Sequence, residues 1–195
     1  MDEMTRLDLL LDVDGILANF IDPALEEVAA LTGLRHHHDE VTQWDIMECL
    51  GIPDDVAEAA YARMKREGFC ASLPVYPGAQ EGVEMLRSVC NLYIVTSPLG
   101  GAHWAHEREM WLWEHFRIPG KTVISTSAKY KCVGDVFVDD KSSNLEKWSA
   151  KHPRDCAVRW SVRSNSQDIW NGIQTNNWAE LRGIVVGLSH ARSVR

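Results

Sequence analysis

The sequence predicts an α/β fold: a three-layer sandwich on a five-stranded parallel sheet, with a small helical cap inserted near its beginning. Short apolar runs alternate along the chain with segments of helical periodicity, which is typical of parallel strands joined by right-handed crossovers. Residues 18–74 break this alternation and are predominantly helical in pattern. The 195 residues suffice for one well-buried core and an insert, but are few for two independent domains.

The first strand is expected at residues 7–13, where the run L-D-L-L-L-D-V suits a strand buried on both faces and ends at Gly15. A helix is expected at residues 22–32, because its apolar residues recur at helical spacing. Residues 34–73 look like a small helical insert that includes a periodic stretch at residues 54–65. We therefore expect a catalytic core of residues 1–17 and 75–195 and a cap of residues 18–74.

After Pro74 the chain returns to the alternation of strands and helices, beginning with a turn at Pro77-Gly78. We expect the remaining strands at residues 91–95, 122–125, 133–138 and 157–162, and helices at residues 79–88, 107–116 and 178–184. The strand at 133–138 ends at two consecutive carboxylates, Asp139 and Asp140. Strands of this kind, separated by helices, complete the parallel sheet.

Composition limits the classes of partner. The net charge of -8 argues against a nucleic acid polymer, whose binding needs clustered Lys and Arg, but allows a small phosphorylated molecule. The five cysteines are scattered, without the spacing of a zinc site, so free thiols in a reducing compartment are expected. The sequence contains no run of about 18 apolar residues, which a membrane span would need, and we expect a cytoplasmic protein.

Polar residues follow the apolar runs where the strands of a parallel sheet would end. Because ligand sites lie beyond the carboxyl ends of such strands, these residues should converge. Four carboxylates at one edge would repel one another unless a cation neutralised them, and oxygen ligands suit Mg²⁺. The converging residues are Asp12, Asp14, Thr96, Ser97, Asp139 and Asp140. The predicted metal ligands are Asp12, Asp14, Asp139 and Asp140.

Asp12 and Asp14 are suited to phosphoryl transfer. A carboxylate can attack phosphorus to form an aspartyl-phosphate, which divides hydrolysis into two easier steps, and Asp12 is placed for that role. Asp14, two residues along, can protonate the leaving alkoxide and later deprotonate water. Gly15 allows a tight turn without a side chain that would block the phosphate.

Motifs across nearly the whole chain resemble those of a known family. The segment L-D-V-D-G-I-L-A at residues 11–18 is similar to the first motif of haloacid dehalogenase phosphatases, and its second Asp argues against a dehalogenase. T-S-P-L at residues 96–99, Lys129, and G-D-V-F-V-D-D at residues 134–140 resemble the 5'(3')-deoxyribonucleotidases of that superfamily. The resemblance implies a phosphatase with a haloacid dehalogenase-like Rossmannoid core.

The resemblance also implies roles for residues outside the first motif. Thr96 and Ser97 would bind the phosphate. Lys129, ten residues before Asp139, stands where the family keeps a catalytic lysine that pairs with nucleophile and phosphate, although Lys131 is a rival. Asp139 and Asp140 would complete the magnesium site, and the sequence leaves open which of the two binds the metal directly.

Substrate choice in the family comes from the cap and from residues near the phosphate. Phe20 resembles a substrate-binding Phe that contacts the base, and Trp44 and Phe69 are candidates on the insert; packing within the cap is the alternative role for these rings. Arg108 stands where relatives have a cation near the phosphate. Where several relatives have Lys after the T-S-P-x segment, this chain has Gly100-Gly101.

Together these observations predict a magnesium-dependent phosphomonoester hydrolase whose leading substrate, by resemblance, is a 5'- or 3'-(deoxy)nucleoside monophosphate. Two other functions stay open: a phosphatase for a sugar or other small metabolite phosphate, and a non-catalytic protein that senses nucleotides. The expected partner is the small phosphomonoester, and the sequence leaves open whether the protein forms a homodimer.

Overall fold

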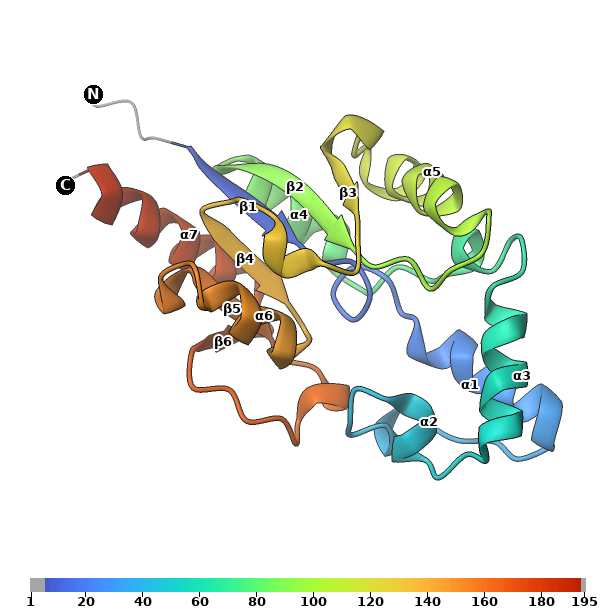
Figure 1. The fold of residues 1–195 in the computed structure, drawn as a ribbon. Coiled ribbons are helices and arrows are strands. Elements are labelled where there is room, and N and C mark those ends of the chain that lie inside the picture. Colours follow the sequence, from blue (N-terminus) through green and yellow to red (C-terminus); the bar gives the residue numbers. More distant parts are fainter. Residues whose placement is uncertain (1–5, 194–195) are drawn as a thin grey trace.

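The computed structural model describes residues 6–193 and contains a six-stranded sheet in which all pairings are parallel (Figure 1). The strand order is β3-β2-β1-β4-β5-β6, so β1 lies at the centre beside β2 and β4. The carboxyl ends of these three strands therefore share one edge. The strands are β1 (Leu7–Leu11), β2 (Cys90–Thr96), β3 (Val123–Ser125), β4 (Val136–Asp139), β5 (Ala157–Trp160) and β6 (Ile173–Thr175).

The predicted number of strands was wrong, because the sheet has six strands and not five. The additional strand, β6, is the three-residue run I-Q-T, which is too short to show an apolar period. It is defined by its pairing with β5, where Val158 lies opposite Ile173. The strand expected from residue 133 begins at Val136 instead, and Val133 is 85% exposed.

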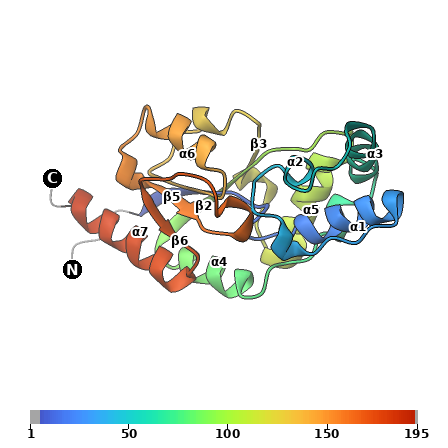
Figure 2. The same cartoon turned by 90° about the horizontal axis from the view of Figure 1, so that it is seen from below.

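Helices cover both faces of the sheet, which gives the three layers (Figure 2). α4 and α7 lie against one face and α6 against the other. Side chains alternate along β1, so Leu9 and Leu11 enter the core on the first side and Leu10 enters the core on the second. The helices are α1 (Ile21–Thr32), α2 (Ile46–Cys49), α3 (Asp54–Met64), α4 (Ala79–Arg87), α5 (Trp104–Phe116), α6 (Ser142–Ser149) and α7 (Trp178–Ser193).

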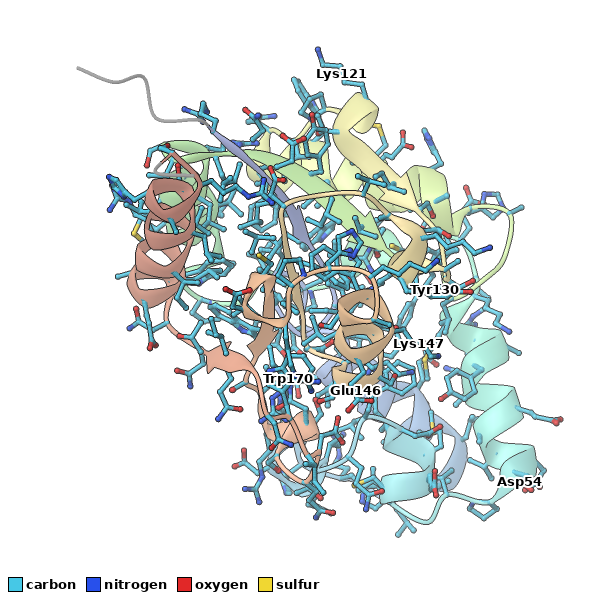
Figure 3. All side chains as sticks on the ribbon, turned by 60° about the vertical axis from the view of Figure 1, so that its left-hand side comes forward. Asp54, Lys121, Tyr130, Glu146, Lys147 and Trp170 are labelled. Carbon is cyan, nitrogen blue, oxygen red and sulfur yellow. The ribbon has the colours of Figure 1, made fainter. Side chains whose placement is uncertain are left out.

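The first three helices form a separate body beside the end of the sheet (Figure 1). Their buried residues, which include Val28 and Met64, make a hydrophobic cluster of their own. Figure 3 shows Asp54 of this body and Lys121 of the core at opposite ends of the molecule. The two connecting segments run side by side, with Ala18 paired to Val75. This pairing supports the division that we propose between a core and a cap of residues 18–74.

The sheet positions the polar residues that follow its strands. Asp12 comes directly after β1, its backbone N–H donating to the Val138 carbonyl at 3.0 Å, so it stays joined to β4. Thr96 is the last residue of β2 and Asp139 the last of β4. Neighbouring strands thus bring these three positions together at the edge that faces the cap. Across residues 6–193, no helix combines the length and apolar character needed to cross a membrane.

Candidate active site

Asp12 is held rigidly at the end of β1. The residue is only 5% exposed. Oδ1 accepts a hydrogen bond from the N–H of Val13 at 2.7 Å, and Oδ2 lies 2.6 Å from Lys129 Nζ. These contacts fix the carboxylate in one orientation with its charge partly compensated.

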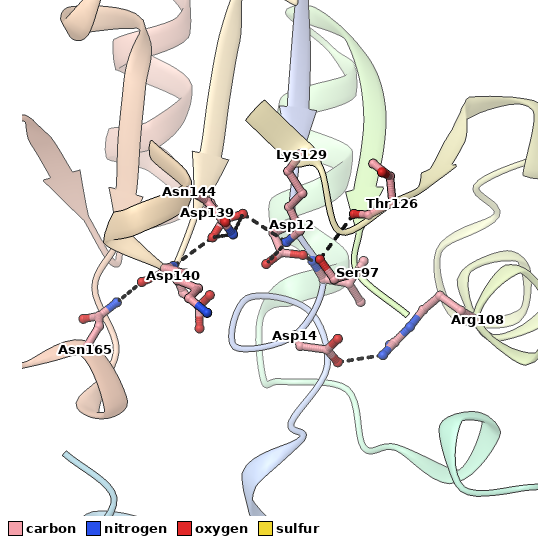
Figure 4. Close-up of polar contacts among 12 residues, drawn as sticks. Asp12, Asp14, Ser97, Arg108, Thr126, Lys129, Asp139, Asp140, Asn144 and Asn165 are labelled. Atoms are coloured by element: carbon pink, nitrogen blue, oxygen red, sulfur yellow. Dashed lines mark hydrogen bonds and ion pairs between the residues drawn. The ribbon is translucent and has the colours of Figure 1, made fainter. Parts of the chain in front are cut away.

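Lys129 bridges two carboxylates (Figure 4). Besides Asp12, its Nζ lies 3.0 Å from Asp139 Oδ2. Burial alone would lower the pKa of Lys129, but the charges and hydrogen bonds of Asp12 and Asp139 outweigh it and hold that pKa above its ordinary value. Lys131 is exposed and lies over the ring of Tyr130. The structure therefore places Lys129 among the carboxylates and Lys131 outside them.

Asp139 and Asp140 have different hydrogen bonding. Both oxygens of Asp139 accept from Asn144 Nδ2 at 3.1 Å, and Oδ1 also accepts from the N–H of Lys141 at 2.8 Å. The Asp140 carboxylate is 6% exposed and accepts no hydrogen bond from any residue that the structure describes. Asp139 is thus fully engaged by the protein, whereas Asp140 keeps its oxygens free for a ligand.

The cluster holds more carboxylates than positive charges to balance them. Burial raises the pKa of Asp12 from 3.8 to about 7, because desolvation and the nearby carboxylates together exceed the opposing effect of Lys129. Burial and the charges of Asp12 and Asp139 raise the pKa of Asp140 well above its ordinary value. Asp12, Asp139 and Asp140 each offer an oxygen within 4.8 Å of the others'. A set of oxygen ligands whose negative charge is only partly compensated fits a hard divalent cation such as Mg²⁺.

Gly15 is required by the packing of this cluster. It has a φ of +81°, a backbone conformation that residues other than glycine rarely adopt. A Cβ at this position would lie 2.2 Å from Asp140 Oδ2. The turn after Asp14 therefore passes directly against the Asp140 carboxylate because residue 15 has no side chain.

Asp14 is turned toward Arg108 of α5 and lies outside the group of three carboxylates (Figure 4). Its Oδ1 is 2.6 Å from Arg108 Nη2. The guanidinium is 1% exposed and lies about equally far from the rings of Trp104 and Trp111, at 5.5 and 5.4 Å from their centroids. Arg108 does not line the cavity described below, so among the described residues it contacts the site through Asp14.

Thr96 ends β2 and Ser97 follows it directly. Thr96 is 1% exposed, and its hydroxyl has no hydrogen-bond partner among the described residues. Such an orphaned buried hydroxyl is costly unless a ligand or water satisfies it. Ser97 donates a weak hydrogen bond to the Thr126 carbonyl at 3.3 Å and lines the cavity.

A cavity of about 360 Å³ separates the carboxylates from the cap. The core contributes carboxylates and Lys129 to its lining, and most of the aromatic and aliphatic lining residues come from the cap. Phe20 and Trp44 both line it, and Phe69 packs against Phe20 from outside the lining. The apolar lining residues are Phe20, Ile21, Trp44, Ile46, Tyr61, Pro98, Leu99 and Trp104.

Several residues of the site were missed from the sequence. Lys141 Nζ lies 3.0 Å from the centroid of the Trp44 ring and so joins core to cap, and Asn144 holds Asp139. Both follow the Asp139-Asp140 pair within five residues, and that proximity was the available signal. Trp104 and Tyr61 also line the cavity and were not among the predicted site residues.

The sequence matches the family of 5' nucleotidase, deoxy (pyrimidine), cytosolic type C proteins over residues 6–192. The match covers the described chain almost from end to end. The chain belongs to this family. The predicted family and enzyme class are thus confirmed: the protein is a phosphatase, and its fold is shared with haloacid dehalogenase-like hydrolases.

Individual relatives agree with this assignment. A Staphylococcus epidermidis protein named "Putative 5'(3')-deoxyribonucleotidase" is 26% identical over 153 residues, which cover 76% of this chain and 82% of the relative. A haloacid dehalogenase-like hydrolase from Streptococcus pneumoniae has a TM-score of 0.59 at 12% identity, covering 91% of this chain and 97% of its own. Another from Xanthomonas campestris has a TM-score of 0.55 at 10% identity, with coverages of 99% and 100%. The two solved structures show a shared fold.

Proposed function

We propose that the protein is a magnesium-dependent nucleotidase that hydrolyses 5'- or 3'-(deoxy)nucleoside monophosphates through an aspartyl-phosphate on Asp12. The observation that carries this proposal is the cavity itself. Its lining combines carboxylates and Lys129 from the core with aromatic rings from the cap and α5. A nucleoside monophosphate carries a charged phosphate and a planar base on one sugar, so both kinds of lining residue would find a matching part of the substrate.

The chain's own residues supply the two steps. An oxygen of Asp12 attacks phosphorus, the bond to the leaving oxygen breaks, and Asp14 donates a proton to the departing alkoxide. Water then attacks the phosphorus while Asp14 takes its proton, and the bond between Asp12 and phosphorus breaks. The products are an alcohol and inorganic phosphate, and both carboxyl groups return to their starting states.

The neighbouring residues orient these groups. Lys129 favours the ionised form of Asp12, which is the attacking form. Arg108 holds Asp14 at the mouth of the cluster, and the unpaired Thr96 hydroxyl can donate to a phosphoryl oxygen. Magnesium, bound directly by Asp12 and Asp140 beside the protein-held Asp139, would supply the positive charge that phosphoryl oxygens and carboxylates need.

The name of the Staphylococcus epidermidis relative and the family description both point to deoxynucleotides. Aromatic rings in the cavity lining can stack on a base, because every base has a planar π face. Trp44 lines the cavity and is 49% exposed. We therefore assign Phe20, Trp44 and Trp104 to the leaving group.

The test is phosphate release with Mg²⁺ from a panel of deoxynucleotides, ribonucleotides, sugar phosphates and an aryl phosphate. Asp12→Asn should reduce release by on the order of 10⁴-fold or more, because the nucleophile is lost. Asp54→Asn is the matched control, since it makes the same substitution at an exposed position on the cap, far from the cavity (Figure 3). It should leave activity unchanged.

The panel separates the alternatives. Preference for nucleoside monophosphates, lost in Asp12→Asn, would support the whole proposal. Release from sugar or aryl phosphates alone would retain the aspartyl-phosphate chemistry and reject the nucleotidase assignment. Release that does not depend on Asp12 would reject the mechanism.

A further inference from the structure

Glu107 is a buried carboxyl group that the proposed chemistry does not use. It lies on α5, and the residue is 9% exposed. Oε1 accepts a hydrogen bond from the N–H of Gly68 at 2.8 Å, and Oε2 accepts one from the N–H of Ala71 at 3.2 Å. Within residues 6–193, no ion pair involves Glu107. Two main-chain donors therefore compensate its burial.

Both donors belong to the segment that returns from the cap to the core. Residues 65–74 lead from α3 toward the sheet and include a short 3₁₀ turn, Cys70–Ser72. Because α5 belongs to the core, Glu107 ties this returning segment to the core at two points. A carboxylate can accept at both oxygens, whereas the amide of Gln would present its NH₂ to one of the two N–H groups.

The returning segment carries Phe69 between the two tied amides. The Phe69 ring packs edge-on against Phe20, with centroids 6.1 Å apart, and stacks on Trp104 at 6.2 Å. Phe20 and Trp104 line the cavity. The position of the returning segment therefore sets the position of an aromatic wall.

The next residue on α5 connects to the chemistry. Arg108 pairs with Asp14 at 2.6 Å, and Trp104 lies one turn earlier on the same helix. The first half of α5 thus contacts the returning segment, the aromatic wall and the acid/base residue.

We propose that Glu107 is a positioning residue for phosphomonoester hydrolysis: by tying Gly68 and Ala71 to α5, it fixes Phe69, whose ring packs behind Phe20 and Trp104, the wall that receives the leaving group. The inference rests on the proposed function, because it assigns that wall to the leaving group. It predicts an effect on binding of the whole substrate and little effect on the phosphate end of the site.

The experiment compares Glu107→Gln with Glu109→Gln, which removes the same charge from an exposed position on the same helix. The substrate is the phosphomonoester that the wild type hydrolyses fastest, and inorganic phosphate is the competitive inhibitor. Loss of one charge-assisted hydrogen bond should raise KM in Glu107→Gln by about 10-fold or more. The inhibition constant of inorganic phosphate should change less than about 2-fold by the same principle, since its contacts are intact. Glu109→Gln should match the wild type.

The results distinguish this inference from the proposed function. If the wild type hydrolyses no nucleoside monophosphate, the proposed function fails, but the comparison still proceeds with the best substrate. If Glu107→Gln leaves KM unchanged, or raises KM and the phosphate inhibition constant together, the positioning role of Glu107 is rejected.

Two further measurements apply even if Glu107→Gln does not fold. Phe69→Ala should raise KM for the same substrate while sparing the phosphate inhibition constant, because it removes the ring that the tie positions. Amide hydrogen exchange in the wild type should be slower at Gly68 and Ala71 than at amides of similar exposure that lack a hydrogen-bond partner. In a folded Glu107→Gln protein, exchange should accelerate there first. Unprotected amides in the wild type, or an unchanged KM in Phe69→Ala, would overturn the inference.

Discussion

Single atoms decide the geometry of the carboxylate cluster. Asp12 and Asp139 share one lysine, and Asp140 lies against the bare backbone of Gly15. Each contact fixes a group that the sequence could only place at the same edge. The site residues assigned from motifs remain predictions until variants are measured, although the structure brings the main group together.

Gly15→Ala is expected to inactivate the protein without unfolding it. The new Cβ would lie 2.2 Å from Asp140 Oδ2, so the carboxylate must move. The positive φ adds backbone strain. A displacement of about 1 Å in such a site can cost about 100-fold in rate. Phosphate release and circular dichroism measure the two effects.

The matched control is Gly51→Ala, which has a φ of +64° but nothing within 4 Å of its Cβ. It carries the backbone strain without the collision, so it should lose some stability and keep its activity. Equal activity in both variants would mean that Asp140 does not need its present position.

The cysteines should differ in reactivity. Burial tends to raise the pKa of Cys49, but hydrogen bonds from the N–H and hydroxyl of Thr42 outweigh it and leave that pKa below its ordinary value of 9.0. Burial raises the pKa of Cys70 and of Cys90 to about 12. Because the thiolate is the reactive form, Cys49 should label first with iodoacetamide, and its rate should rise with pH at a lower midpoint.

Peptide mass spectrometry after timed labelling measures this order. Cys49→Ser should abolish the fast phase, and labelling in denaturant should modify all cysteines at similar rates. Rapid labelling of Cys90 in the folded protein would contradict the expectation.

At the scale of elements, two helices on one face of the sheet meet through a glycine. Gly82 lies inside α4, and a Cβ there would be 2.1 Å from Trp178 of α7. Glycine is otherwise unfavourable inside a helix by about 1 kcal/mol relative to alanine. Close approach of the two helices therefore outweighs local propensity at this position.

Gly82→Ala should lower the free energy of unfolding by about 1–3 kcal/mol, because it overpacks this contact. Gly183→Ala is the matched control: it also lies within a helix, α7, but has nothing within 4 Å of its Cβ. It should raise stability by about 0.5–1 kcal/mol. Urea unfolding measures both, and stabilisation by both substitutions would show that α4 and α7 can separate at no cost.

Element prediction succeeded where a segment carried its own period and failed where pairing decided. The helix expected at residues 54–65 matches α3, and the central strands were found because both of their faces are buried. β6 has three residues at the edge of the sheet, and α6 was not anticipated after the Asp pair. Short elements owe their form to neighbours, so their own residues give little signal.

The balance of charge in the site should affect the stability of the whole molecule. Asp140 is buried beside two other carboxylates, has no hydrogen-bond donor among the described residues, and destabilises the metal-free fold. Asp140→Asn should therefore raise the free energy of unfolding in EDTA by about 1–3 kcal/mol. Mg²⁺ at 100 times its dissociation constant should stabilise the wild type by about 2.7 kcal/mol.

The variant should gain much less from Mg²⁺, because it lacks one proposed ligand. Urea unfolding with EDTA and with Mg²⁺ gives the four free energies, and Asp54→Asn serves again as the exposed control. An equal gain from Mg²⁺ in the wild type and in Asp140→Asn would place the ion elsewhere.

The sequence by itself determined the α/β class, the order of the motifs and the enzyme family, because these depend on local apolar patterns and on residues at fixed spacing. Tertiary structure alone decided the sixth strand, the position of Lys129 among the carboxylates with Lys131 outside them, the turn of Asp14 toward Arg108 and the tie from Glu107 to the returning segment. Each of these joins residues far apart in the chain. Local periodicity records which face of an element is buried, whereas such contacts depend on how the elements pack together in space.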